Sequence, residues 1–308
     1  MNVLSLLFVT VIWGMGFIAT KWTLVDYSPL WSNSIRFFFA ALISLPFLVY
    51  FKSYNLRDRF KLKWIFAASL CLLAGMLLQT MGLEYTTAAK SGFITCLYSL
   101  IIPLMVMSYS KKRYGFLFWL LLSQSLVGIA MLCDFQWSNF NYGDFLTLIC
   151  AFAFAGHFLC VNQIANKFSS IELNSLQCFL VGVFSIPLVL AMETAPDLAP
   201  LLDFTSITTE SSLLGFLLLS LFSSFIAFGI LASAQKTLSP HIVGMICLLE
   251  SPFAAILGFL FLSESLNTTG IVGCILVMCS VGLLPFTQKE NIRAVLQWLG
   301  RSKPMVKS

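Results

Sequence analysis

Ten continuous apolar segments of about 20 residues recur along this chain, and no other feature limits its fold as strongly. A helix of about 20 residues rises about 30 Å, which is the thickness of the hydrocarbon core of a bilayer. The segments are continuously apolar rather than alternating, which argues against membrane-spanning strands. We predict transmembrane helices at Leu4–Thr20, Trp31–Tyr50, Trp64–Leu83, Ser91–Tyr109, Tyr114–Met131, Asp144–Ile164, Leu173–Met192, Ser212–Ala232, His241–Leu262 and Thr269–Phe286.

The scarcity of charged residues supports the same interpretation. Only 10% of the 308 residues are charged and 59% are hydrophobic, whereas a soluble domain has about 25% charged and about 45–50% apolar residues. Such a chain lacks the charged side chains that keep a soluble surface wet, so its solvent is a bilayer. The N-terminal segment continues through Trp13 without a small-residue cleavage site, and we interpret it as the first span rather than a signal peptide.

The nine cysteines do not indicate a disulfide framework or a metal site. Nearly all of them lie inside apolar segments, and none has the paired spacing of metal ligands. The sequence also lacks a phosphate-binding Gly-x-x-x-x-Gly-Lys-Ser/Thr loop, a Gly-x-Ser-x-Gly nucleophile elbow and a His-Glu-x-x-His motif. We therefore expect no cofactor, no metal ion, no nucleic acid partner and no enzymatic activity.

The basic residues predict the orientation of the spans. With the N-terminus inside, 15 of the 18 Lys and Arg residues fall in inner loops or the C-terminal tail, and nine of the 13 acidic residues fall in outer loops. The positive-inside rule then places both termini in the cytoplasm of a bacterial-type inner (plasma) membrane. In the tail, Ile292, Val295, Leu296 and Leu299 recur at helical spacing, which predicts an amphipathic helix on the cytoplasmic surface.

An internal repeat relates the two halves of the chain. A shift of 141 residues places Asn33 on Asn174 and Pro46 on Pro187, and a shift of 149 residues places Pro103 on Pro252. Each repeat contains five spans, and an odd number means that the second copy enters the membrane from the opposite side. We predict an all-α membrane protein with a first repeat at 1–138, an inverted second repeat at 139–288 and a tail at 289–308.

Several motifs in order resemble the EamA-type branch of the drug/metabolite transporter superfamily, over almost the whole chain. The motifs are Trp13-Gly14-Met15-Gly16-Phe17, Ser28-Pro29 to Arg36-Phe37, Leu248-Leu249-Glu250-Ser251-Pro252, and Leu262-Ser263-Glu264-Ser265-Leu266 followed by Gly270 and Gly273. In this chain Ser251 stands where the family has proline, and the first half has Lys111-Lys112-Arg113 in place of a glutamate loop. The resemblance implies a secondary carrier with a central cavity lined by spans one to four and six to nine, with the fifth and tenth spans peripheral.

Two charged residues at membrane depth are the first candidates for binding the transported solute. Arg36 lies in the second span and Glu250 in the middle of the ninth, where an ionised side chain is costly unless it faces protein or water. Arg36 could pair with Glu250 across the cavity or bind a carboxylate or phosphate of the solute. A structural ion pair, or an Arg36 side chain that reaches the outer surface, remains the alternative.

Polar residues at repeat-related positions form a second group of candidates. Asn33 with Arg36, and Asn174 with Gln177, are three residues apart and so project from one helix face. They could bind the solute or hold helices together through hydrogen bonds. His157 could titrate in a proton-coupled cycle, or it could be a neutral core histidine.

Aromatic residues and prolines complete the candidate site. Trp13, Phe17 and Tyr98 could form an apolar wall, although most of the 30 phenylalanines must simply face lipid or neighbouring helices. Prolines occupy matching places in the two halves and remove helix hydrogen bonds there, which predicts kinks or hinges. These hinge candidates are Pro46, Pro103, Pro187 and Pro252.

Taken with the resemblance, these features predict a secondary active transporter, an exporter or exchanger of a small polar or amphiphilic metabolite such as an amino acid, working by alternating access. Its partners would be that metabolite, the lipid bilayer and protons or a counter-transported solute, and it would be a monomer or a homodimer. Import or exchange of nucleotide-like metabolites is an open alternative. An integral-membrane enzyme acting on lipid-linked substrates and a non-transporting scaffold are alternatives of other classes.

Overall fold

A computed structural model describes residues 2–52, 58–110, 113–134, 139–202, 211–261 and 267–287, and these residues form helices joined by turns, without strands. The first half contains α1 (Asn2–Thr23), α2 (Pro29–Tyr50), α3 (Arg59–Tyr85), α4 (Ala88–Cys96), α5 (Tyr98–Ser110) and α6 (Phe116–Leu132). The second half contains α7 (Tyr142–Ile164), η2 (Ala165–Lys167), α8 (Ser170–Met192), α9 (Ala199–Leu202), α10 (Ser212–Leu217), η4 (Leu218–Ala227), α11 (Phe228–Ala234), α12 (Pro240–Cys247), α13 (Glu250–Phe261), α14 (Thr268–Leu283) and η5 (Leu284–Thr287).

The prediction of ten membrane-spanning helices is confirmed. Within the described ranges, nine helical segments of at least 18 residues are apolar enough to cross a membrane, and the apolar helix α6 is the shorter tenth. Side-chain hydrogen bonds cap the starts of many of these helices. Ser28 accepts from the backbone N–H of Trp31 at the start of α2, and Asn141 and Asp144 form a capping box at the start of α7. The predicted C-terminal amphipathic helix lies outside the described residues.

Three spans that the sequence predicts as continuous α-helices are irregular. The fourth span breaks at Leu97, between α4 and α5, and the ninth breaks at Leu248 and Leu249, between α12 and α13. Because Pro252 has no N–H to donate to the carbonyl of Leu248, the backbone N–H of Ser251 donates to it instead, at 3.3 Å. The eighth span is π-helical over ten residues, η4, between α10 and α11.

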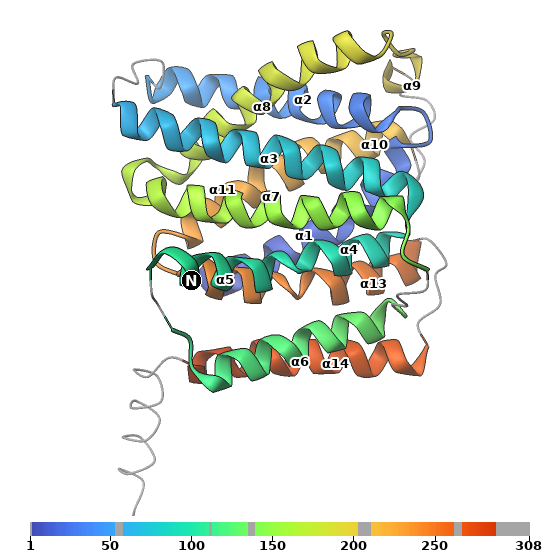
Figure 1. Ribbon diagram of the computed structural model, residues 1–308. Coiled ribbons are helices and arrows are strands. Elements are labelled where there is room, and N and C mark those ends of the chain that lie inside the picture. The colour runs from blue at the N-terminus through green and yellow to red at the C-terminus, as the bar shows by residue number, and fades with distance from the viewer. Residues whose placement is uncertain are drawn as a thin grey trace, which may run out of the picture.

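The packing of the spans shows the inverted repeat. In Figure 1, α2 lies beside α8 at one edge of the bundle and α6 beside α14 at the other, with the remaining spans between them. The third span packs on the sixth, and the repeat-related eighth span packs on the first. The first span likewise packs on the ninth, and the sixth on the fourth. Each contact therefore recurs between repeat-related elements, as the fold class predicts. The limits of the repeats at 138 and 288 stay a prediction.

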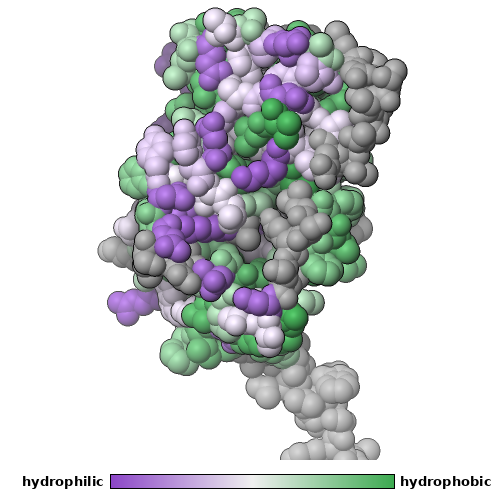
Figure 2. All heavy atoms as spheres, turned by 90° about the vertical axis from the view of Figure 1, so that its right-hand side faces the viewer, coloured by the Kyte–Doolittle hydropathy of each residue, from purple (hydrophilic) through white to green (hydrophobic). Residues whose placement is uncertain are grey.

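The two ends of the bundle carry opposite charges. The end that holds the N-terminus and the turns after α2, α5, η2 and α11 is called the basic face, with Lys52, Arg59, Lys61, Lys63, Arg113, Lys167 and Lys236. The other end is called the acidic face, with Asp26, Glu84, Asp134, Glu193 and Asp197. Figure 2 shows hydrophilic side chains gathered over the acidic face. The bundle thus has two wet ends and an apolar circumference between them.

One acid that the sequence assigns to an outer loop is buried. Asp144 lies in the first turn of α7 with its side chain fully buried, and its Oδ2 atom is 2.5 Å from Lys90 Nζ. Thr86 donates to Asp144 Oδ1 at 2.8 Å. This carboxylate therefore joins the start of α4, the end of α3 and the start of α7, rather than remaining in water.

The fifth and tenth spans pack backbone to backbone. A Cβ atom on Gly273 of α14 would lie 2.2 Å from the carbonyl oxygen of Gly128 of α6, which leaves no room for a side chain. Small residues allow this close approach, which takes the place of a hydrophobic driving force between helices in lipid. The pair lies at the lower edge of Figure 1, in the peripheral place that the resemblance implies for these spans.

Candidate functional site

A cavity lies in the middle of the bundle, and seven spans line it. The space between the lining side chains, including its opening, amounts to about 460 Å³. The lining residues are Trp13, Gly16, Phe17, Thr20, Arg36, Met76, Gln79, Thr95, Tyr98, Phe154, Phe158, Ser223, Phe228 and Glu250. The lining includes spans one to four, six, eight and nine. The seventh span, α8, contributes no lining residue, although the resemblance implies that it would.

Arg36 is held in the cavity wall by two serines of the π-helical segment. It lies two turns into α2, and its side chain is buried. Its Nε atom donates to Ser224 Oγ at 2.7 Å, and its Nη2 atom donates to Ser223 Oγ at 2.9 Å. In the part of the chain that the structure describes, no protein group accepts from Nη1, so this donor has no protein partner.

Glu250 brings the opposite charge to the same cavity. It is the first residue of α13, directly after the break in the ninth span, and its side chain is buried. Among the described residues its carboxylate has neither a hydrogen bond nor an ion pair, and the hypothetical pairing with Arg36 is not formed. A carboxylate at this depth needs water or a solute group to compensate its desolvation.

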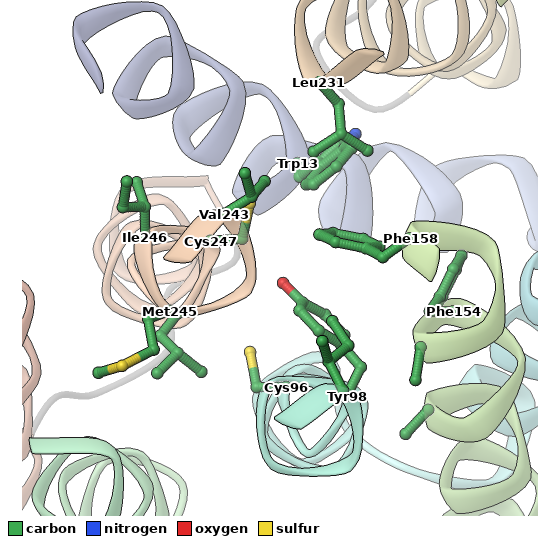
Figure 3. Close-up of a cluster of buried hydrophobic side chains, with 14 of the residues drawn as sticks. Trp13, Cys96, Tyr98, Phe154, Phe158, Leu231, Val243, Met245, Ile246 and Cys247 are labelled. Atoms are coloured by element: carbon green, nitrogen blue, oxygen red, sulfur yellow. The ribbon is translucent and has the colours of Figure 1, made fainter. Parts of the chain in front are cut away.

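Aromatic rings form the end of the cavity that is nearer the basic face. Phe158 and Phe228 each lie six residues before the basic end of their helical spans. Tyr98 stacks on Phe158 with ring centroids 5.1 Å apart, and Trp13 packs against Phe228 at 5.0 Å. In Figure 3 the rings of Trp13, Tyr98 and Phe158 come from three spans and turn toward one another. We call these four residues the aromatic floor.

Apolar side chains fill the space between the aromatic floor and the basic face. Leu231, Val243, Ile246 and Cys247 lie there, and all four are buried in the same hydrophobic cluster as the floor (Figure 3). Among the described residues, these packed side chains therefore separate the central cavity from the basic face. At its other end, the lining reaches to Thr20, three residues before the acidic end of α1.

Asn33, Asn174, Gln177 and His157 lie behind the cavity wall rather than in its lining. Asn174 Nδ2 donates to the carbonyl oxygen of Phe225 at 2.7 Å, which ties α8 to the π-helical segment. His157 Nε2 lies 2.7 Å from Gln177 Oε1, and because an amide oxygen only accepts, the ring proton is on Nε2. These contacts of Asn174, Gln177 and His157 are the hydrogen bonds between helices that the structural alternative predicts, whereas the buried Asn33 amide has no hydrogen-bond partner among the described residues.

The four prolines do not line the cavity. Pro46 and Pro187 lie inside α2 and α8, which both continue through them. Pro103 lies in α5 and Pro252 in α13, within the two spans that are broken. A hinge role for these prolines stays a prediction.

The inverted repeat relates residues of the cavity to one another. The two shifts that relate the halves of the sequence also relate lining residues to one another. The pairs are Trp13 with Phe154 and Phe17 with Phe158 at a shift of 141 residues, and Gln79 with Phe228 at a shift of 149. The cavity therefore lies where the two halves meet, which is the place that an inverted-repeat carrier needs for its solute.

The same shifts relate a hydrogen-bonded contact on each face. On the acidic face, Lys21 Nζ donates to the carbonyl oxygens of Leu83 at 2.6 Å and Thr86 at 3.0 Å, which joins α1 to the end of α3. On the basic face, Asn162 Nδ2 donates to the carbonyl oxygen of Gln235 at 3.5 Å, which joins α7 to the end of α11. Asn162 is the counterpart of Lys21, and Gln235 is the counterpart of Thr86.

Sequence reasoning missed the lining residues Gly16, Thr20, Met76, Gln79 and Thr95, and two further parts of the site. The first is Ser223, which contacts Arg36; the cluster Ser220, Ser223, Ser224 within an otherwise apolar span was the signal that could have found it. The second is the set Phe154, Phe158 and Phe228, which nothing in the sequence separates from the other phenylalanines.

Comparisons with known proteins agree on fold and family. The sequence model of the EamA-like transporter family matches residues 1–133 and again residues 141–285. A solved crystal structure superposes with a TM-score of 0.72 at 15% identity, covering 91% of this chain and 94% of the other, which shows a shared fold.

Several relatives with curated names are transporters. An uncharacterized transporter of Archaeoglobus fulgidus is 28% identical over 90% of this chain and 83% of its own length. An S-adenosylmethionine uptake transporter of Rickettsia bellii is 24% identical over 83% of each chain. The uncharacterized transporter YoaV of Bacillus subtilis is 21% identical over 92% of this chain and 96% of its own length.

Proposed function

This chain belongs to the EamA-like transporter family, and from that premise we propose that it is a secondary carrier that moves a small zwitterionic metabolite, such as an amino acid, by alternating access. The observation that carries the proposal is the composition of the central cavity. A guanidinium with an open donor and a carboxylate without a protein partner line one cavity together with six aromatic side chains.

This combination matches the chemistry of an amphiphilic zwitterion. Arg36 Nη1 would bind the carboxylate of the solute, and Glu250 would bind its ammonium group. The aromatic rings, among them Trp13 and Phe158, would pack against its apolar part. Each solute charge would thus meet an opposite charge already placed at the bilayer depth, which lowers the cost of leaving water.

The direction of transport and the coupling are parts of the proposal. The charge difference between the two faces favours a basic face in the cytoplasm of a bacterial-type inner membrane, with both termini on that side. Export would follow the solute gradient or would be driven by exchange for protons or another solute. The carrier would work as a monomer or a homodimer.

A second candidate is uptake of S-adenosylmethionine or a related nucleoside-bearing amino acid. Two relatives, from Rickettsia bellii and Rickettsia prowazekii, are named S-adenosylmethionine uptake transporters. The same cavity would suit such a solute, because its aromatic rings can stack on a base and attract a positively charged sulfonium. An enzyme acting on lipid-linked substrates has less support, since the described residues include no group of three metal-binding side chains and several curated relatives are named transporters.

Counterflow into proteoliposomes tests the proposal and separates the two candidates. Purified protein would be reconstituted and assayed with each proteinogenic amino acid and with S-adenosylmethionine, with protein-free liposomes as the control. Saturable flux of an amino acid supports the first candidate, and flux of S-adenosylmethionine alone supports the second. No flux of any of these solutes would count against both.

A further inference from the structure

A second cavity opens at the basic face, below the sealed side of the aromatic floor. The space between its lining side chains, including its open side, amounts to about 870 Å³. Its walls come from the end of α5, the segment just before α6, the end of α7 with η2, and the turn between α11 and α12 together with the first residues of α12. We propose that this basic-face cavity is a second binding station for the transported solute, where a carboxylate or phosphate group of the solute binds Lys236.

The charge of the lining selects an anionic group. Lys236 is half-buried, and within the described ranges its ammonium group has no hydrogen bond or ion pair. The lining also contains His241 and several amide and hydroxyl groups, but no Asp or Glu. A partly desolvated ammonium group without a nearby carboxylate attracts an anion more strongly than a fully solvated lysine does.

Gln235, the residue before Lys236, lines the same cavity and carries a hydrogen-bond acceptor without a partner among the described residues. Gln235 is buried, and its Nε2 atom donates to the carbonyl oxygen of Phe158 at 3.2 Å. Its Oε1 atom is also buried and has no hydrogen-bond partner among the described residues. A buried acceptor without a donor costs free energy, so a solute N–H group that reaches it would be bound favourably. Lys236 and Gln235 together therefore suit a solute that carries both an anionic group and an N–H donor.

Aromatic side chains give this cavity a wall that can hold the rest of the solute. The rings of Tyr114 and His241 lie 4.6 Å apart, between their centroids, and Phe118 packs against the same histidine at 5.5 Å. Asn166 Nδ2 donates to the carbonyl oxygen of Lys236 at 3.3 Å, which fixes the turn that carries the lysine. The proposed station is therefore formed by helices and turns that also border the apolar side chains on the basic side of the aromatic floor.

Phe158 lies between the two cavities. Phe158 turns its ring to the central cavity, whereas its backbone carbonyl accepts from Gln235 of the basic-face cavity. We therefore place the basic-face cavity next on the path of a solute that passes the aromatic floor. This inference rests on the proposed carrier function, since it makes the cavity a station on the same path.

The test compares solute affinity on the two faces. Flux of the best substrate from the panel of amino acids and S-adenosylmethionine would be measured in right-side-out and inverted membrane vesicles. We expect K236M to raise the half-saturating concentration at the basic face about tenfold, the change typical of losing one charge-assisted hydrogen bond. The value at the acidic face should stay within about twofold. K236R, which keeps the charge, should stay near the wild type.

Lys167 provides a matched control on the same face. Its ammonium group lies 4.4 Å from the centre of the Phe60 ring, and it does not line the basic-face cavity. K167M should therefore leave both half-saturating concentrations unchanged. If K167M and K236M have equal effects, or if K236M changes both faces equally, the station does not exist and the effect is one of general surface charge.

A lipid headgroup could supply the same anionic chemistry, and the bilayer composition separates the two sources. The K236M difference in solute affinity should persist in proteoliposomes of phosphatidylcholine alone. If it appears only with phosphatidylglycerol, Lys236 binds lipid and the proposed station is wrong. Flux in the wild type with no change in K236M would overturn the station alone, whereas a wild type without flux of any panel solute would overturn the carrier function together with it.

Discussion

Replacing Arg36 by Gln tests the proposed recognition of the solute carboxylate. The wild-type guanidinium uses Nε and Nη2 to bind Ser224 and Ser223, and leaves Nη1 open toward the cavity. A hydrogen bond between charged groups contributes about 1.5–3 kcal/mol. At about 1.4 kcal/mol for each factor of ten, R36Q should weaken solute binding by about tenfold to about 150-fold.

The assay pairs the mutation with a change in the solute. Half-saturating concentrations for counterflow would be measured for a transported amino acid and for the amine that lacks its carboxylate. In the wild type the amine should bind about tenfold to about 150-fold more weakly than the amino acid. In R36Q the amine and the amino acid should bind about equally. R36K should fall between, because one ammonium group cannot bind both serines and the solute in the planar geometry of a guanidinium.

Folding and charge are controlled by two further measurements. Size-exclusion profiles and melting temperatures of each variant would show whether the bundle remains folded. S223A removes one serine that holds the guanidinium but keeps its charge, so it should cost less affinity than R36Q. If R36Q weakens the amino acid and the amine equally in a folded protein, Arg36 does not contact the carboxylate, and the reasoning is refuted.

Two further predictions concern stability in detergent, measured by thermal unfolding. G273A should lower the free energy of unfolding by about 1–3 kcal/mol, because its Cβ atom would lie 2.2 Å from the Gly128 carbonyl oxygen, whereas G282A in the same helix meets no atom within 4 Å and should change nothing. K90M should cost about 3 kcal/mol by leaving the buried Asp144 carboxylate without its cation, and K90M combined with D144N should be more stable than K90M alone. Equal melting temperatures for the two glycine variants, or a double variant less stable than K90M, would contradict these packing and charge arguments.

The span pattern and the repeat could be predicted because both depend on composition over many residues. A run of about 20 apolar residues has one stable state in a bilayer, so small errors at its ends do not change the fold. The breaks at Leu97 and at Leu248 depend on local backbone geometry, and the π-helical segment adds a residue to each turn without any change in hydropathy. Hydropathy therefore predicts the spans but not their internal irregularities.

For the candidate site, residues that are rare at membrane depth were easier to find than common ones. Arg36 and Glu250 stand out because each ionised group requires a partner in the membrane, and both line the cavity. The same reasoning selected His157 and Asn174, which each hydrogen-bond to another helix behind the wall through one nitrogen atom, while His157 Nδ1 and Asn174 Oδ1 have no partner among the described residues. A polar residue in a span predicts that a partner exists, but the packing of neighbouring helices decides whether that partner is protein or solute.

The unequal ends of the central cavity have an energetic consequence. The aromatic floor contains two ring pairs, Trp13 with Phe228 and Tyr98 with Phe158. The repeat-related residues, which would close the acidic end of the cavity, are Phe154 with Gln79 and Phe17 with Cys247, so neither of these pairs joins two rings. Each aromatic pair contributes about 0.5–1.5 kcal/mol beyond the area it buries. Two such pairs would therefore favour the state closed toward the basic face over the state closed toward the acidic face by about fivefold to about 150-fold. If the chain is the carrier proposed above, its empty form would therefore face the acidic side of the membrane most of the time. The change of the empty carrier from this state to the one facing the basic side would be slower than the reverse change.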